Sequence, residues 1–202
     1  EEQARAIQYF SEAVALLESR HVPAQLGEAF LGRAAAATNL NQIDDAMADY
    51  ARARVALRQA NDTLALLKIE ANEGFLALQR GLPAQALPQL ESASQGFEQW
   101  GALNEAIFTR IGEIEAQLLL LQVNDALDSV VVAERLAQRI ENRTTLISLA
   151  LTKSLALAAA GRWNQARSVL NELRESKPPL SATTDALVGK QLAAILLDEG
   201  KP

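Results

Sequence analysis

The stretch GLPAQALPQLESA at residues 81–93 returns in altered form eighty residues later, as GRWNQARSVLNEL at residues 161–173. Both stretches begin with Gly, carry Ala five residues later, and place an apolar residue four positions after that Ala. Sliding this pattern along the chain finds the same Ala at every fortieth residue: Ala6, Ala46, Ala86, Ala126 and Ala166. The chain therefore repeats a unit of 40 residues.

The residues around each Ala form a small–large–small stripe, which is typical of one face of a packed helix. The large positions are Phe10, Tyr50, Leu90, Val130 and Leu170, and the mostly small positions that follow are Ala13, Ala53, Ala93, Ala133 and Leu173. Five residues before four of the alanines stand Asn41, Gly81, Leu121 and Gly161. Gly and Asn tolerate a left-handed backbone, so the pattern predicts a turn before each of these helices.

A second set of Ala- and Leu-rich amphipathic segments lies between the first, at about 24–39, 64–80, 104–120 and 144–160. Each unit is therefore predicted to be a helix–turn–helix. The units are 22–61, 62–101, 102–141 and 142–179, with half units at 1–21 and 180–202. No single pair of helices buries both of its apolar faces, so the units are expected to stack. The sequence predicts an all-α fold: one right-handed α–α superhelix of antiparallel helix pairs, with about ten helices.

Turn residues agree with these boundaries. Pro23 and Pro83 suit the first turn of a helix, and SKPPLS at 176–181 predicts the clearest break. Pro88 falls inside the helix that Pro83 opens, so we expect a kink or a later start there. His21, the only histidine, falls in an expected turn.

These stretches resemble the tetratricopeptide repeat family. Its second helix carries the same small–large–small positions, preceded five residues earlier by Gly, and Pro178 falls where the family usually has Pro. The 40-residue unit is similar to the longer variety found in large bacterial regulators and signalling proteins. The first helices depart from the family pattern: Phe30 fits its aromatic position, whereas Glu70, Arg110 and Ala150 do not. The resemblance implies a scaffold that binds proteins or peptides.

Composition narrows the classes of function. The net charge is −6 with both signs interspersed, which argues against a nucleic-acid partner. There is no cysteine, one histidine and no known catalytic or phosphate-binding motif, so we expect no enzyme activity, no cofactor and no metal site. No apolar run reaches the ~20 residues of a membrane span, so we expect a soluble protein. The sequence does not assign its compartment, although we favour the cytoplasm over the periplasm. Because the chain starts at Glu1 rather than Met, we interpret it as a fragment of a longer protein.

The inner face of the predicted superhelix is the first candidate binding surface. Family members that clamp a peptide carboxylate use Lys and Asn there, whereas the matching positions of this chain are mainly apolar. Such a face is expected to hold an amphipathic helix, unless the same residues form the helix–helix core. The candidate residues are Leu31, Ala35, Asn72, Phe75, Leu78, Ile111, Glu115, Leu118 and Leu155.

A charged column forms the second candidate surface. Arg33, Glu73, Glu113 and Lys153 recur at the 40-residue step. Either a partner protein reads this polar ladder, or neighbouring helices place opposite charges against it.

Three functions follow from these patterns. The first is a non-catalytic protein- or peptide-binding module of a bacterial regulatory or signalling protein. The second is a structural module whose ends or apolar face join two copies in a homodimer. The third is a ligand-sensing domain of a transcriptional regulator.

Overall fold

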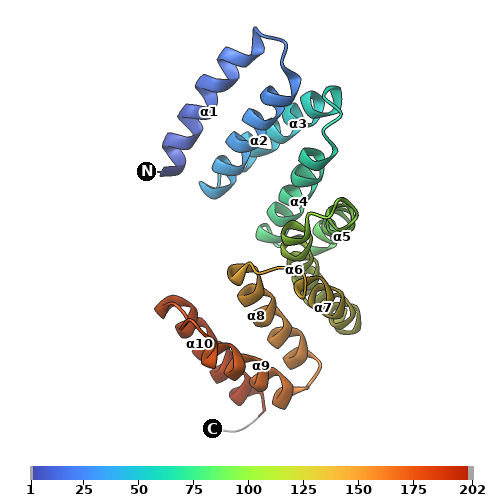
Figure 1. Cartoon of the computed structure of the whole chain (residues 1–202), viewed down its shortest axis with the longest axis vertical. Helices are drawn as coiled ribbons and strands as arrows, with labels where there is room; N and C mark the ends of the chain where they lie inside the picture. The colour runs from blue at the N-terminus through green and yellow to red at the C-terminus, as the bar shows by residue number, and fades with distance from the viewer. Residues whose placement is uncertain (1, 200–202) are drawn as a thin grey trace. The chain divides into compact units, whose positions relative to one another are not determined.

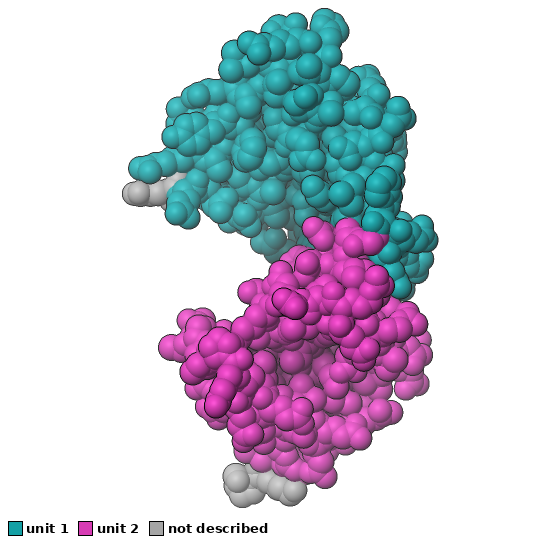
Figure 2. Space-filling model, in the orientation of Figure 1, with its two compact units in different colours: residues 1–100 teal, residues 101–202 magenta. Residues whose placement is uncertain are grey.

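The structure, a computed structural model, describes residues 2–199, and this part of the chain forms ten α-helices (Figure 1). They are α1 (Glu2–Glu18), α2 (Pro23–Asn39), α3 (Ile43–Gln59), α4 (Thr63–Gln79), α5 (Pro83–Trp100), α6 (Leu103–Leu119), α7 (Val123–Ala137), α8 (Arg143–Ala159), α9 (Trp163–Glu175) and α10 (Ala182–Asp198). The chain divides into two compact units, residues 1–100 with α1–α5 and residues 101–202 with α6–α10 (Figure 2). We call them unit 1 and unit 2.

Consecutive helices pack as antiparallel neighbours within each unit (Figure 1). In unit 1, α2 packs against α3 and α4 against α5; in unit 2, α6 packs against α7 and α8 against α9. These pairs confirm the predicted all-α array of helix–turn–helix repeats with ten helices. The predicted half units reach residues 1 and 202, and residues 1 and 200–202 lie outside the described part of the chain.

The small–large–small stripe forms the core of both units. Ala46, Ala86, Ala126 and Ala166 are fully buried. The large residues next to them, such as Tyr50 and Leu90, are no more than 1% exposed. The small side chains allow neighbouring helices to approach closely. The large side chains are therefore tightly packed between them.

Left-handed turns separate the helices, as the sequence predicts. Asn41, Gly81, Leu121 and Gly161 have φ between 58° and 71°. The residue after each of these turns closes the preceding helix: the Gln42 N–H, for example, donates to the Ala37 carbonyl at 2.9 Å. His21, Asn61 and Gly101 also have positive φ, so left-handed turns occur every 20 residues from His21 to Leu121 and again at Gly161, but not at Glu141.

Leu121 is the one leucine that takes this left-handed conformation among the described residues, at φ 61°. Its side chain is 85% exposed, so it adds little to the core. Holding a non-glycine residue in the left-handed conformation costs about 1–2 kcal/mol. Replacing it with Gly removes that cost, but the greater conformational freedom of Gly in the unfolded chain offsets part of the gain. We expect Leu121→Gly to stabilise unit 2 by about 0.5–1 kcal/mol, measured by urea unfolding. The reverse type of change, Gly161→Ala, is the control and should destabilise it; equal stability of both variants and the parent would contradict this explanation.

The predicted late start near Pro88 is wrong. Helix α5 begins at Pro83 and continues through Pro88 to Trp100. Pro88 has no N–H to donate to the Ala84 carbonyl. Both residues lie on the exposed side of the helix, where water is available to hydrogen-bond groups that the helix leaves unpaired.

Candidate binding groove

The charged column of first-helix residues pairs with side chains of neighbouring second helices. Arg33 forms a two-pronged ion pair with Asp49 of α3, through Nε at 2.6 Å and Nη2 at 2.8 Å. Glu73 accepts from Arg54 of α3 at 2.5 Å. In unit 2, Ser129 of α7 donates to Glu113 at 2.7 Å, and Lys153 donates to Glu134 of α7 at 2.6 Å. These contacts favour the second interpretation of the column, in which it joins neighbouring helices of the chain itself.

Two of these pairs are the same contact with reversed charge. Arg54–Glu73 joins α3 to α4, and Glu134–Lys153 joins α7 to α8 at positions two repeats later. If α3 packed against α8 instead, Arg54 would face Lys153. Because like charges in contact disfavour such a pairing, the reversal helps to select the correct neighbour within each unit.

The nine inner-face candidates divide into core and surface. Leu31 and Ile111 are buried, and Leu78 and Leu118 pack against buried clusters of their own units. Ala35, Asn72 and Phe75 are half-buried, whereas Glu115 and Leu155 are exposed. Of the position shared by Ala35, Phe75, Glu115 and Leu155, which we call the solvent-facing stripe of the first helices, only Glu115 and Leu155 are exposed. Phe75 packs against the buried cluster of Ala77, Ala86 and Leu90.

Glu115 is the one residue of this stripe with a perturbed pKa. It keeps part of its surface in solvent, but the surrounding chain reduces the hydration of its carboxylate, which raises the pKa. Ionisation in the folded state is therefore less favourable than in the unfolded chain.

We expect Glu115→Gln to be more stable than the parent at pH 7, by a margin that disappears in acid. In the parent, the free-energy cost of ionising Glu115 in the folded state is absent below the pKa of Glu in the unfolded chain, about 4.3. This cost grows as the pH rises through the pKa of Glu115 in the folded state. Urea unfolding at a series of pH values checks this. Glu105→Gln, on the same helix in its exposed first turn, is the control; a margin independent of pH would contradict the assignment.

A groove in unit 2 surrounds the Lys153–Glu134 pair. Two cavities of about 430 and 420 Å³ both include these two side chains. Helix α8 supplies the apolar floor, α7 and α9 the walls, and exposed polar side chains the rim. The floor and wall residues are Leu127, Val130, Val131, Leu146, Leu149, Ala150, Leu157, Val169 and Leu173; the rim includes Gln138, Arg162 and Glu172. We call this site the α8 groove.

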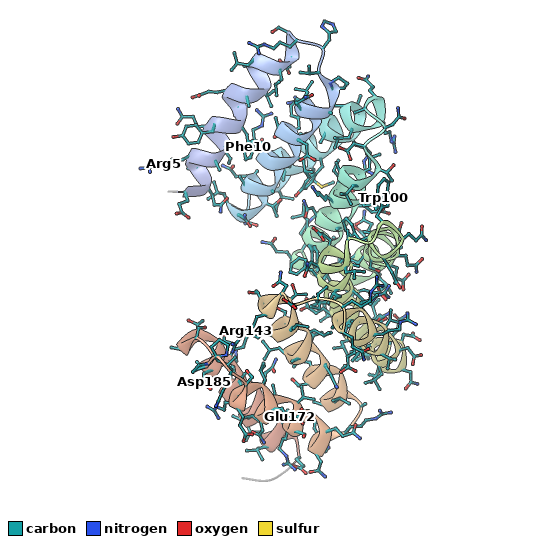
Figure 3. All side chains as sticks on the ribbon, in the orientation of Figure 1. Arg5, Phe10, Trp100, Arg143, Glu172 and Asp185 are labelled. Atoms are coloured by element: carbon teal, nitrogen blue, oxygen red, sulfur yellow. The ribbon has the colours of Figure 1, made fainter. Side chains whose placement is uncertain are left out.

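Short helices open one end of the α8 groove. Helix α7 has 15 residues and α9 has 13, compared with 17 in α3. Both stop beside the first turns of α8, where Leu146 and Leu149 line the larger cavity. Helix α9 ends early because Pro178 disfavours a helical Lys177. The segment after α9 is tied to the start of α8, where Figure 3 labels Arg143. Arg143 donates hydrogen bonds to the Pro178 carbonyl and to Ser176.

Unit 1 has a smaller version of the groove, a cavity of about 270 Å³ crossed by Arg33. Five of its lining residues, Ile7, Ser11, Arg33, Ala37 and Gln42, stand three repeats before Leu127, Val131, Lys153, Leu157 and Arg162 of the α8 groove. The same position of the repeat thus carries a cavity once in each unit, between successive second helices and beside a residue of the charged column. In unit 1 both partners of the Arg33–Asp49 ion pair line the cavity.

Lys153 is the one residue of the α8 groove that the sequence pattern predicted as a candidate; the other lining residues were not predicted. The walls of the groove come from α7 and α9, and the signal was the SKPPLS break that shortens α9. In the described residues, no group of three or more His, Cys, Asp or Glu side chains is placed to hold a metal ion. None of the helices described has the length and apolar character needed to cross a membrane.

Comparison with known proteins does not assign the chain to a family. None of the known family models matches the sequence, and a search of curated proteins also gives no match.

Proposed function

We propose that this chain is a non-catalytic scaffold, similar to the long tetratricopeptide repeats, that binds a segment of another protein in the α8 groove. The observation that carries the proposal is the groove itself: an apolar floor beside a half-exposed ion pair. The two cavities, at about 430 and 420 Å³, fall within the range of about 300–1,000 Å³ that is typical of ligand pockets. A bacterial regulatory or signalling protein is the setting that the repeat length supports.

The chemistry of the groove defines the partner. Apolar side chains of an amphipathic helix fit the cavities on either side of Lys153, where buried apolar area supplies most of the affinity. The Lys153–Glu134 pair stays hydrogen-bonded across the middle, so the segment crosses it without displacing it. Glu172, exposed at the rim, favours a basic residue at the edge of the segment.

The solvent-facing stripe of first helices is a weaker candidate. Leu155 is 43% exposed, but none of the four stripe residues lines the α8 groove or the smaller cavity of unit 1.

The proposal is tested with peptides selected from a random displayed library against the immobilised chain. Binding of the selected peptides is then measured by calorimetry with Ala150→Trp, which fills the groove, and Ala159→Trp, an exposed position on the same helix. We expect Ala150→Trp to weaken binding at least about tenfold, equivalent to about 1.4 kcal/mol, and Ala159→Trp to leave it unchanged. Circular dichroism checks that both variants fold. Peptides that bind the folded Ala150→Trp variant as well as the parent would contradict the proposal.

A further inference from the structure

The floor of the α8 groove has a small side chain at a position where α2, α4 and α6 carry a large one. The residues at this position, spaced by 40, are Phe30, Glu70, Arg110 and Ala150. Phe30 and Arg110 are buried, at 5% and 6% exposed, and Glu70 is half-buried. Ala150 lines the cavity of about 430 Å³. The larger cavity of the groove therefore lies where the other three helices have a long side chain.

Unit 1 shows which side chain fits at this position. Phe30 belongs to a buried core cluster, against which Leu17 of α1 also packs. The guanidinium carbons of Arg33 and Arg52 lie 5.4 and 5.8 Å from the centre of its ring, within the roughly 6 Å of a cation–π contact. An aromatic ring with two cations next to it, one from α2 and one from α3, thus fills this position in unit 1.

Unit 2 has small side chains at two positions where unit 1 has large ones. Ala150 stands at the position of Phe30, and Ala137 of α7 stands at that of the α1 leucine; both alanines line the cavity. Two other lining residues, Leu149 and Leu173, are larger than their unit 1 equivalents, which are alanines. These leucines add apolar surface, but the cavity remains. A side chain that enters it takes the place of the ring that unit 2 lacks.

The two cations next to the ring in unit 1 have equivalents of opposite charge in unit 2. Lys153 stands at the position of Arg33 and lines the cavity. Both are paired with a carboxylate of a second helix, and this pairing does not keep Arg33 from the ring of Phe30. Glu172 of α9, labelled in Figure 3, stands at the position of Arg52 and is exposed at the rim. A ring in this cavity thus lies near one cation of the chain, and the nearby carboxylate attracts a cation of the partner.

We propose that the α8 groove selects a helical segment that carries an aromatic anchor and, three or four residues away, a Lys or Arg. The anchor enters the cavity beside Ala150 and takes the place that Phe30 has in unit 1. The basic residue binds Glu172, since residues three or four apart lie on one face of a helix. The inference rests on the proposed function, because it names the side chains by which that partner is recognised. A leucine anchor has no ring for Lys153 to contact.

Two small probes, N-acetyl-phenylalaninamide and N-acetyl-leucinamide, test the anchor without a selected peptide. Each is titrated into the 202-residue chain and followed by methyl NMR. We expect the phenyl probe to shift the signals of Leu146, Leu149 and Val169, which line the cavity. It should bind at least about fivefold more tightly than the leucine probe. Ala150→Phe supplies the ring from the chain itself and should abolish binding. Ala159→Phe, exposed on the same helix, is the control, and circular dichroism checks both folds.

Peptides selected from the random library test both parts of the motif. We expect them to share one aromatic position with a Lys or Arg three or four residues away. Exchange of the aromatic residue for Leu should weaken binding to the parent at least about fivefold. Exchange of the basic residue for Gln should weaken binding to the parent, but have much less effect on binding to a Glu172→Gln variant.

The outcomes separate this inference from the proposed function. Peptides that Ala150→Phe excludes, but that share no aromatic position or bind equally well with Leu there, overturn the inference and leave the groove as the binding site. Peptides that bind the folded Ala150→Phe variant as tightly as the parent overturn both. If the library gives no binder, the probes decide: a phenyl probe that binds no more tightly than the leucine probe overturns the inference. If Ala150→Phe does not fold, the exchange of the aromatic residue for Leu in the peptide decides, because it uses the parent chain.

Discussion

Replacing Asp49 with Ala is expected to lower the free energy of unfolding of unit 1 by about 3 kcal/mol. Asp49 and Arg33 have side chains only 8% and 17% exposed, and two short hydrogen bonds join them. This partnership raises the pKa of Arg33, which stays charged in the variant. Ala therefore leaves a mostly buried guanidinium without its carboxylate, between Ser11 and the ring of Phe30. Urea unfolding followed by far-ultraviolet circular dichroism measures the loss.

Asp185→Ala is the matched control. Asp185 also makes a two-pronged ion pair, with Arg174 at 2.7 and 3.2 Å, but both side chains are nearly half exposed. Water replaces the lost partner there, so the effect should be much smaller than that of Asp49→Ala. The double variant Arg33→Met, Asp49→Leu removes both charges and should recover part of the loss. Equal losses for Asp49→Ala and Asp185→Ala would contradict the burial argument.

Replacing Gly74 with Ala is expected to destabilise unit 1 by about 2 kcal/mol, although Ala is the better helix former. A Cβ atom at Gly74 would lie 2.7 Å from Leu90 Cγ and 2.9 Å from its Cδ2. Leu90 is fully buried and has no free direction in which to move. Overpacking of up to about 3 kcal/mol thus outweighs a helix-propensity gain of about 1 kcal/mol. Thermal and urea unfolding of the variant measure the balance.

Gly189→Ala should have the opposite sign. This glycine also lies inside a helix, α10, but a Cβ atom there would meet only Arg174 Nη2, at 3.8 Å. The propensity gain of about 0.5–1 kcal/mol is then unopposed. If Gly74→Ala stabilised the protein as much as Gly189→Ala, the close packing of α4 on α5 would be wrong.

The fold could be predicted because its determinants are local and repeated. The small–large–small stripe places the same residue types on the same helix face five times, and the structure buries Ala46, Ala86, Ala126 and Ala166 completely. Turn residues indicated the left-handed positions at Asn41, Gly81 and Gly161. Leu121 stands at the same position of the repeat and also has positive φ, although its residue type does not predict it. The repeat therefore carried information that single-residue preferences do not.

The groove could not be predicted in the same way. Its shape depends on how far α7 and α9 extend over α8 and on the partner that Lys153 selects. The same column position pairs forward in α2, to Asp49, and backward in α8, to Glu134. That choice is set by the charges on two neighbouring helices and not by the column itself. Leu31 and Ile111 matched an inner-face pattern although the structure buries them in the core. Their burial, like the pairing of the charged column, depends on the neighbouring helices and not on the repeat position alone.

Methyl-resolved NMR of the chain during titration with a selected peptide tests the central proposal most directly. The α8 groove contains Leu and Val methyl groups on all three of its helices, including Val131, Leu149 and Val169. We predict that the peptide shifts these signals and leaves those of Leu78 and Leu155 unchanged. Saturable shifts confined to Leu78 and Leu155, or to methyl groups of unit 1, would contradict the assignment of the groove as the binding site.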